Sequence, residues 1–262
     1  MVHWTESLFV ESPELFSQEF DSRLERAGEE VDDILELVAK EYDLEPTRVL
    51  DVPCGIGRHV VPFAESDVEA HGVDISSTFL ERARERAKED GVDDRVTVFE
   101  GDVRRLDETA PLEGPYDLAV NLWTSFGYYD EKTDRRFLRT LADLLTPDGV
   151  LVLEMIDKEG VLADFDDGAV WTTDDRVYAE QHDYDPLTSR IRSTRWVLDD
   201  EGQLLGTYEV DLRCYAPVEL RSLLEDAGFE EIALFSSLSG EEVTRESTRL
   251  VATARTAIDT GE

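Results

Sequence analysis

Cysteine and long apolar runs are scarce in this sequence. The two cysteines, Cys54 and Cys214, lie far apart, which fits neither a zinc-binding spacing nor a disulfide framework. No apolar stretch approaches the roughly 20 residues of a membrane-spanning helix, and the N-terminal stretch lacks the basic and apolar regions of a signal peptide. We therefore expect no metal site and no membrane partner, and we predict a soluble, cytoplasmic protein.

Basic residues are also few, because 26 Lys and Arg stand against 62 Asp and Glu, a formal net charge of −36. The acidic residues are spread between regular apolar patterns, which argues against disorder. At molar salt the Debye length falls to roughly 3 Å, so that such a surface repels itself little. This acidic composition predicts a protein from a salt-accumulating halophile. Without a basic patch, nucleic acid is not expected as a partner.

Apolar runs alternate with amphipathic segments over the first 156 residues. A helix with apolar residues at three- and four-residue spacing runs from about Leu24 to Val38 and should end before Pro46. Strand and helix patterns then alternate, which indicates βαβ units and a parallel sheet covered by helices on both faces. The strands are expected at 48–52, 68–73, 95–99, 116–122 and 149–156, and the helices near 57–66, 77–90 and 131–145.

The pattern changes after about residue 165. Alternating apolar and polar residues fill three stretches, which the turn-forming segments DPLTS and DDEGQ separate. These stretches, near 169–183, 189–198 and 204–215, predict an antiparallel β-meander inserted into the α/β pattern. That pattern then returns with a helix at 217–227, Gly228 as its cap, and strands near 229–235 and 248–254.

The stretch VLDVPCGIGRHV, at 49–60, places two glycines directly after a predicted strand. The dinucleotide fingerprint G-x-G-x-x-G would need a glycine where Val60 stands. The loop alone therefore leaves open a dinucleotide site, a site for another nucleoside cofactor, and a plain turn between strand and helix.

Acidic or amide residues follow four successive predicted strands: Asp51, Asp74, Asp102 and Asn121. Aspartate is a poor strand residue, and each one alone could be a solvated surface charge in so acidic a chain. Ligands of open parallel sheets bind beyond the carboxyl ends of the strands. The ordered series therefore predicts a ligand site at this edge of the sheet.

Over residues 46–157, and again over 217–254, the sequence resembles the class I S-adenosylmethionine-dependent methyltransferases. Their first motif, a strand followed by D-x-G-x-G-x-G, is matched by DVPCGIG at 51–57. Pro53 replaces the first glycine, as in a subgroup with a D-x-P-C-G-x-G-R-H loop. The resemblance implies a Rossmann-like α/β fold with a seven-stranded sheet, and S-adenosylmethionine as the cofactor.

The resemblance also implies roles for single residues. Asp51 would lie near the amino group of the cofactor's methionine part, Asp74 would hold the ribose diol, and Asp102 would meet the adenine amino group. The fourth motif, which lines the sulfonium, is matched by Asn121 and Leu122. The expected cofactor-binding residues are Asp51, Cys54, Gly55, Gly57, Arg58, Asp74, Ile75, Gly101, Asp102, Val103, Asn121 and Leu122.

No single catalytic residue stands out. Methyl transfer from a sulfonium needs mainly that the nucleophile be held in line with the methyl group, and a base is needed only where the acceptor must lose a proton. Aromatic residues after the fourth strand could bind a small amine or ring substrate, or could pack a helix onto the sheet. The substrate-site candidates are Trp123, Phe126, Tyr128, Tyr129, His182 and Arg195, of which His182 could instead be a packing residue and Arg195 could pair with nearby carboxylates.

We predict in-line methyl transfer from S-adenosylmethionine to a nitrogen or oxygen of a small molecule. A catalytically silent cofactor-binding or regulatory protein of the same fold is the alternative. Val60 and the Gly101-Asp102 turn disfavour a nicotinamide oxidoreductase. The sequence NLWT, in place of N-P-P-Y or D-P-P-Y, disfavours a base-directed nucleic-acid methyltransferase.

The expected division of the chain has three parts. An N-terminal helical lid segment spans 1–45, and the methyltransferase core spans 46–165 and 216–262. The β insertion at 166–215 would cover the acceptor site or form the contact of a homodimer. The identity of the acceptor does not follow from the sequence.

Overall fold

The computed structural model describes residues 2–173 and 175–257. Its central sheet has seven strands in the order β10-β11-β5-β4-β1-β2-β3. The neighbours among β1 to β5 pair in parallel, and β11 runs antiparallel to β5 and β10. The strands are β1 (Arg48–Asp51), β2 (Glu69–Asp74), β3 (Val96–Glu100), β4 (Tyr116–Asn121), β5 (Leu145–Ile156), β10 (Phe229–Phe235) and β11 (Arg249–Thr256).

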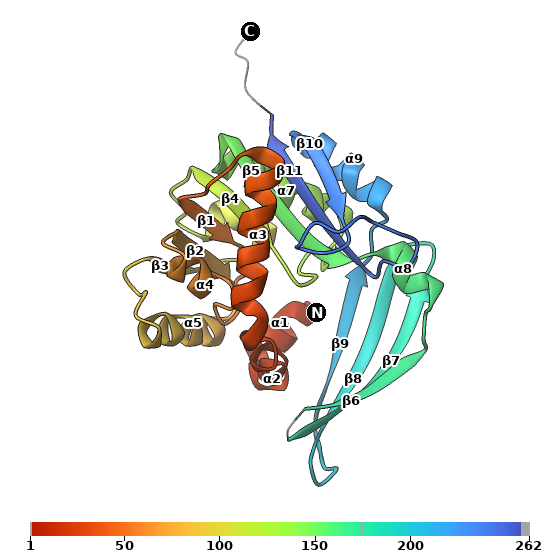
Figure 1. Ribbon diagram of the computed structural model, residues 1–262. Helices are drawn as coiled ribbons and strands as arrows, with labels where there is room; N and C mark the ends of the chain where they lie inside the picture. The colour runs from red at the N-terminus through yellow and green to blue at the C-terminus, as the bar shows by residue number, and fades with distance from the viewer. Residues whose placement is uncertain (1, 174, 258–262) are drawn as a thin grey trace.

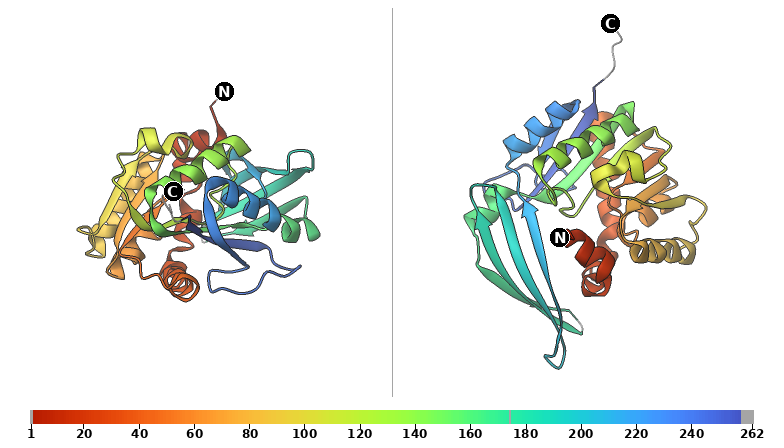
Figure 2. Two further views of the ribbon diagram at one scale, coloured as in Figure 1. Left: turned by 90° about the horizontal axis from the view of Figure 1, so that it is seen from above. Right: turned by 180° about the vertical axis from the view of Figure 1, so that it is seen from behind.

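Helices cover both faces of this sheet (Figures 1 and 2). The first face carries α3 (Ala27–Tyr42), α4 (Val60–Glu65) and α5 (Ser77–Glu89), and the second carries α7 (Glu131–Leu144) and α9 (Pro217–Ala227). The remaining helical elements are α1 (Trp4–Glu6), η1 (Ser7–Glu11), η2 (Pro13–Leu15), α2 (Ser17–Asp21), η3 (Leu24–Arg26), η4 (Val103–Arg105), α6 (Leu106–Thr109) and α8 (Lys158–Ala163).

The sheet buries apolar side chains on both faces because consecutive strand residues point to opposite sides. In β1, Val49 belongs to the core under α3, α4 and α5, whereas Leu50 belongs to the core under α7 and α9. In β5, Val150 belongs to the first of these cores and Leu151 to the second. Such a fully covered sheet requires the near-continuous apolar runs that the sequence shows. The predicted α/β fold with helices on both faces is confirmed.

The insertion is a separate antiparallel sheet in the order β6-β7-β8-β9. The predicted meander is confirmed, but it has four strands where the sequence indicated three stretches, because the stretch 169–183 contains β6 and most of β7. β6 ends at Thr172 and β7 begins at Arg176, so the one predicted stretch corresponds to two strands. The strands are β6 (Gly168–Thr172), β7 (Arg176–Asp185), β8 (Arg190–Asp199) and β9 (Leu204–Arg213).

Residues 4–21 pack between the antiparallel sheet and the core (Figure 1). From here on the name lid segment means these residues alone, because α3, which the expected lid at 1–45 included, packs on the first face of the central sheet. Leu8 and Leu15 form an apolar cluster with Tyr178 and Tyr208 of the insertion. Arg176 adds a hydrogen bond of 2.8 Å to the carbonyl oxygen of Glu14. The lid expected at 1–45 and the core expected at 216–262 also include Met1 and residues 258–262, which lie outside the described residues.

Two further observations concern the classes of protein considered above. Among residues 2–173 and 175–257, no helix combines the length and the apolar character that crossing a membrane requires. The same residues contain no group of three or more His, Cys, Asp or Glu side chains placed to hold a metal ion.

Close packing around α8 supports a prediction about stability. A Cβ atom on Gly160 would lie 1.8 Å from the carbonyl oxygen of Ser247, whereas a Cβ atom on Gly28 would point into open space. We expect Gly160→Ala to lower the free energy of unfolding by about 1–3 kcal/mol, as overpacking typically does. Gly28→Ala, in α3, is the matched control and should leave stability unchanged or raise it by up to about 1 kcal/mol. Urea titration of both variants measures the difference, and equal effects would contradict the packing argument.

Candidate functional site

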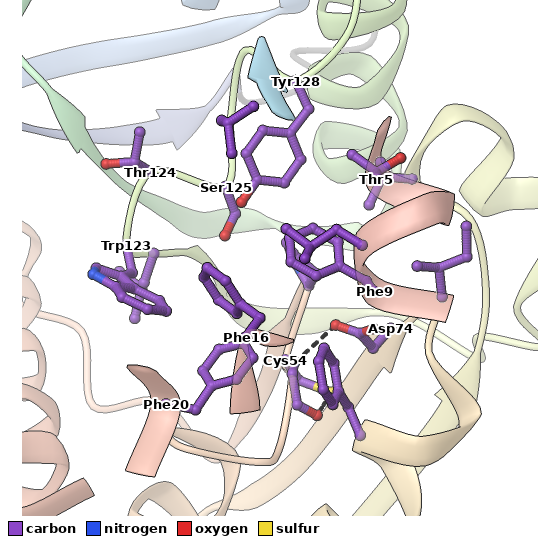
Figure 3. Close-up of a pocket in the computed structure, with 18 of the residues that line it drawn as sticks. Thr5, Phe9, Phe16, Phe20, Cys54, Asp74, Trp123, Thr124, Ser125 and Tyr128 are labelled. Carbon is purple, nitrogen blue, oxygen red and sulfur yellow. Dashed lines mark hydrogen bonds between the residues drawn. The ribbon is translucent and has the colours of Figure 1, made fainter. Parts of the chain in front are cut away.

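A cavity of about 300 Å³ lies beyond the C-terminal ends of the parallel strands and is closed on one side by the lid segment (Figure 3). Phe9, Phe16 and Phe20 of the lid segment project into it, facing Trp123 and Tyr128 of the loop after β4. Among the predicted cofactor residues, those that line the cavity are Cys54, Gly55, Arg58, Asp74, Ile75, Gly101, Asp102, Val103 and Leu122. The other three, Asp51, Gly57 and Asn121, are buried and are not lining residues.

The glycine loop brings backbone to the cavity wall. Gly55 and Gly57 have φ angles of +53° and +77°, which other residues adopt only with strain. A Cβ atom on Gly57 would lie 2.9 Å from the Cβ of Ala83 in α5, so the second glycine permits close packing of loop and helix. A Cβ atom on Gly55 would meet the ring of Phe20 at 3.0 Å. The first glycine therefore lets the Phe20 ring pack directly against the backbone of the loop.

Asp74, at the end of β2, holds this loop in place. Its Oδ2 accepts a hydrogen bond of 2.9 Å from the N–H of Gly55, and its Oδ1 accepts one of 2.8 Å from the N–H of Ser76. Burial raises the pKa of Asp74 to about 6, although these N–H groups act in the opposite direction. Because each carboxylate oxygen accepts more than one hydrogen bond, Asp74 can also bind hydroxyl groups in the cavity.

Asp51 and Asn121 form a pair of unsatisfied acceptors behind the loop. Asp51 is 1% exposed, and no hydrogen-bond donor among the described residues reaches either of its carboxylate oxygens. Burial, together with the charge of Asp74, raises the pKa of Asp51 well above its usual range, while Arg58 lowers it. The Nδ2 of Asn121 donates to the carbonyl oxygen of Val52 at 2.7 Å, but its Oδ1 also lacks a donor among these residues. Buried acceptors of this kind require a donor, and a ligand that carries an ammonium group fits them.

Asp102, after β3, is connected to the lid segment. Its carboxylate accepts hydrogen bonds of 2.9 Å from the backbone N–H and the Nε of Arg104. Arg104 in turn reaches Glu6 of α1 at 2.5 Å. Burial raises the pKa of Asp102, but the hydrogen bonds and charge of Arg104 outweigh it and hold the pKa below the usual range. Near these contacts, the Tyr129 hydroxyl lies 3.1 Å from the Thr5 hydroxyl. Helix α1 is therefore attached to the core at two points, through Glu6 and through Thr5.

The loop after β4 contains a strained turn. Trp123 and Thr124 have φ angles of +56° and +60°, which cost about 1–3 kcal/mol each and persist only where the surroundings enforce them. Glu154 of β5 accepts the N–H of Trp123 on its Oε2 at 2.9 Å, and its carbonyl oxygen accepts the N–H of Thr124 at 3.0 Å. Arg249 of β11 binds both the Glu154 carboxylate and the Thr124 hydroxyl, at 3.0 and 2.8 Å.

Glu154 and Arg249 are not among the residues predicted to form the site. The one signal was a charged residue inside the apolar run VLVLEMI, which contradicts strand burial unless the charge has a partner. His59 was not proposed either, but it lines the cavity and its Nε2 lies 3.0 Å from a carboxylate oxygen of Glu30. Burial lowers the pKa of His59, and Glu30 opposes this.

The arginines beside Trp123 make this end of the cavity positive. The guanidinium carbon of Arg23 lies 4.7 Å from the centroid of the Trp123 ring, and that of Arg58 lies 5.6 Å from it. Arg58 is paired with Glu30. Arg23 lies at the exposed rim, and no carboxylate among the described residues comes within 4 Å of its guanidinium. A ligand with a negative group would find an available cation here.

The structure separates the predicted substrate-site residues into two groups. Trp123, Tyr128, Tyr129 and Arg195 line the cavity. Phe126 instead lies in the core, with ring centroids 6.5 Å from Phe137 and 5.4 Å from Tyr215. His182 is absent from the cavity lining, and its Nδ1 lies 3.2 Å from the Ser193 hydroxyl on the antiparallel sheet.

Comparison with known proteins gives consistent results. Residues 49–149 match a family model described as a methyltransferase domain. The chain is 30% identical over 205 residues to dTDP-4-amino-2,3,4,6-tetradeoxy-D-glucose N,N-dimethyltransferase from Saccharopolyspora spinosa, an alignment that covers 76% of this chain and 77% of that protein. Glycine/sarcosine N-methyltransferase from Halorhodospira halochloris is 31% identical over 117 residues, 44% of this chain and 42% of that protein. The solved structure of the CcbJ methyltransferase from Streptomyces caelestis superposes with a TM-score of 0.74 at 21% identity, covering 86% of this chain and 89% of that one.

Proposed function

Because the chain belongs to the class I S-adenosylmethionine-dependent methyltransferases, we propose that it methylates an amine nitrogen of a small molecule. The observation that carries the proposal is the cavity at the strand ends, which is lined by the glycine loop, Asp74 and Asp102. The two curated relatives named above are both N-methyltransferases, which favours nitrogen over oxygen as the acceptor atom.

The polar groups around the cavity match the groups that S-adenosylmethionine presents. Asp74 would accept the ribose hydroxyls, and Asp102 would accept the adenine amino group. The unsatisfied oxygens of Asp51 and Asn121 would receive the methionine ammonium, and Arg23 would pair with its carboxylate. When bound, the cofactor supplies a methyl group on a positively charged sulfur.

This chain's own residues would contribute position and shielding. An in-line displacement gains most from holding the two reactants together, and the aromatic walls formed by Trp123, Tyr128 and the lid segment would restrict where the acceptor lies. The lid segment would also exclude water, which strengthens the electrostatic interactions inside the cavity. An ammonium acceptor must lose a proton before it attacks.

Calorimetric titration and a product assay test the proposal. We expect S-adenosylmethionine to bind and NADH not to bind, in buffer of high KCl concentration. Glycine, sarcosine and a dTDP-amino sugar are suitable first acceptors, with S-adenosylhomocysteine formation as the readout. NADH binding without S-adenosylmethionine binding would overturn the assignment of the cofactor. Cofactor binding with no turnover on any amine would favour the silent regulatory alternative.

We also propose that the outer face of the antiparallel sheet forms a homodimer contact. Cross-strand pairing places Val170 beside Ala179, Ala179 beside Trp196, and Trp196 beside Thr207, so these four side chains share one face. Val170 is 72% exposed. An apolar row on an exposed sheet face favours association with a second copy.

A single charge on this face tests the contact. We expect Val170→Glu to convert the dimer to a monomer in light scattering, because an interface that buries an unpaired charge is strongly destabilised. Val218→Glu, at a position 73% exposed on α9, is the matched control and should leave the mass unchanged. A wild-type protein that is already monomeric would contradict the proposal.

The net charge of −36 supports three further proposals about the protein's setting. Nucleic acid is not the substrate, since a phosphate backbone would be repelled. The protein works in a salt-rich cytoplasm, where its two buried free cysteines would stay reduced. Its free energy of unfolding should therefore be higher in molar than in millimolar KCl, and equal values would contradict the halophilic origin.

A further inference from the structure

The side of the cavity formed by the antiparallel sheet holds more negative than positive charge. Arg195 of β8 lies between two carboxylates, that of Glu19 in α2 at 2.6 Å and that of Glu180 in β7 at 3.0 Å. These three side chains are only 7–14% exposed. Two carboxylates share one guanidinium, which leaves one negative charge. His182, 3.8 Å from Glu180, adds a positive charge only when it is protonated.

Glu19 is the member of this cluster that can bind a ligand. Its Oε1 accepts hydrogen bonds from Arg195 at 2.6 Å and from the Tyr208 hydroxyl at 2.9 Å. Within the described residues, no donor reaches its Oε2. Glu180 differs, because both of its oxygens accept from the Nη2 of Arg195 at 3.0 Å. Glu19 and Arg195 line the cavity, whereas Glu180 stands behind them.

Aromatic rings line the cavity beside Glu19, and those of Phe16, Phe20 and Trp123 pack against one another. The Phe16 ring has its centroid 5.6 Å from that of Trp123 and 6.4 Å from that of Tyr208, and Phe20 lies 5.4 Å from Trp123. Aromatic faces attract cations, most strongly where water is excluded. Elsewhere in the cavity, Arg58 is paired with Glu30, and Arg23 has no carboxylate within 4 Å among the described residues, so the surroundings of these two arginines repel a cation.

The geometry points to Glu19 as the recognition residue for a positively charged amine acceptor, held beside the ring of Phe16. Glu180 supports this role indirectly. It is also paired with Arg195, so the positive charge of Arg195 does not fully neutralise Glu19. This inference rests on the proposed function and deepens it, since it names the charge of the substrate class. Substrate and product both fit, because an alkylammonium keeps its positive charge when hydrogens on nitrogen are exchanged for methyl groups.

A cation that cannot itself be methylated gives a direct test. Choline and its neutral carbon isostere, 3,3-dimethyl-1-butanol, are titrated by calorimetry into the full chain saturated with S-adenosylhomocysteine, at one fixed KCl concentration. We expect choline to bind roughly tenfold more tightly than the isostere. Equal affinities would overturn the assignment of Glu19 while leaving the cofactor site intact. Failure of S-adenosylhomocysteine itself to bind would instead overturn the proposed function and, with it, this inference.

Two variants separate charge recognition from a structural role of the lid segment. Glu19→Gln should remove most of the preference for choline while the affinity for the neutral isostere stays within about twofold. Glu180→Gln alters a residue outside the cavity lining, and it should also reduce the preference for choline, because Arg195 then neutralises Glu19. Glu14→Gln, at an exposed glutamate of the lid segment, is the matched control.

The outcomes are distinct. An equal loss of choline and isostere affinity in Glu19→Gln would show that Glu19 only holds the lid, and would overturn the inference. If Glu19→Gln does not fold, Glu180→Gln decides alone: an unchanged preference for choline overturns the inference, and a reduced preference supports it.

Discussion

Replacing Asp74 with alanine should weaken S-adenosylmethionine binding by about 1–3 kcal/mol, the usual cost of unpairing buried hydrogen-bonded groups. The substitution removes the acceptor for the ribose hydroxyls. It also removes the partner of the Gly55 and Ser76 N–H groups, so that the glycine loop loses its support. Both effects reduce cofactor affinity. Calorimetric titration measures the loss, and circular dichroism confirms that the variant is folded.

Asp93→Ala, at an exposed aspartate, is the control for removing one charge from a highly acidic protein. Its affinity for S-adenosylmethionine should equal that of the wild type. If Asp74→Ala also bound with unchanged affinity, the ribose site would lie elsewhere in the cavity.

Asp74 should also give the cofactor affinity a pH dependence. Its pKa of about 6 means that the carboxylate is ionised above that pH and protonated below it. Only the ionised form offers both oxygens as acceptors to hydroxyl donors, so binding should weaken as pH falls through about 6. Asp74→Asn, which does not titrate, isolates this contribution. A wild-type profile identical to that of Asp74→Asn would assign the pH dependence to other groups, such as Asp51.

Replacing Glu154 with alanine should lower the free energy of unfolding by about 2 kcal/mol and disturb the Trp123–Thr124 turn. Glu154 accepts the N–H of Trp123, and its loss leaves Arg249 without its carboxylate partner. Hydrogen bonds to charged groups are worth about 1.5–3 kcal/mol. We choose the lower part of this range because both side chains are partly exposed, 17% for Glu154 and 31% for Arg249.

Urea unfolding at a fixed KCl concentration measures this effect, and tryptophan fluorescence reports on the environment of Trp123. Glu230→Ala, at an exposed glutamate of β10, is the matched control and should change stability by no more than about 0.5 kcal/mol. Equal stabilities of the two variants would mean that the turn is held by its own packing.

The strand ends could be predicted from the sequence because the signals there are local. A short apolar run followed by Asp51, and another followed by Asp74, locate the carboxyl edge of a parallel sheet without any knowledge of tertiary contacts. The two glycines after β1 mark the tight turn for the same reason. This local information was sufficient for the fold and for one wall of the cavity.

The opposite wall depends on tertiary structure and could not be predicted in the same way. Within NLWTSFGYYD, the sequence does not distinguish Phe126, which is buried in the core, from Trp123, which lines the cavity. The positive φ angles of Trp123 and Thr124 decide which way each ring points, and Glu154 and Arg249, distant in sequence, hold that turn. Likewise, nothing near Asp102 indicates that Arg104 also binds Glu6.

The lid segment touches both ends of the cavity. Glu6 is attached, through Arg104, to Asp102 at one end, and Glu19 is attached to Arg195 at the other. A ligand that stabilises the packed position of the lid segment from one end raises the population of that position. The other ligand then binds a protein in which this position is already favoured. Thermodynamic linkage requires the effect to be equal in both directions. Cofactor and acceptor should therefore bind cooperatively, each raising the affinity for the other by the same factor.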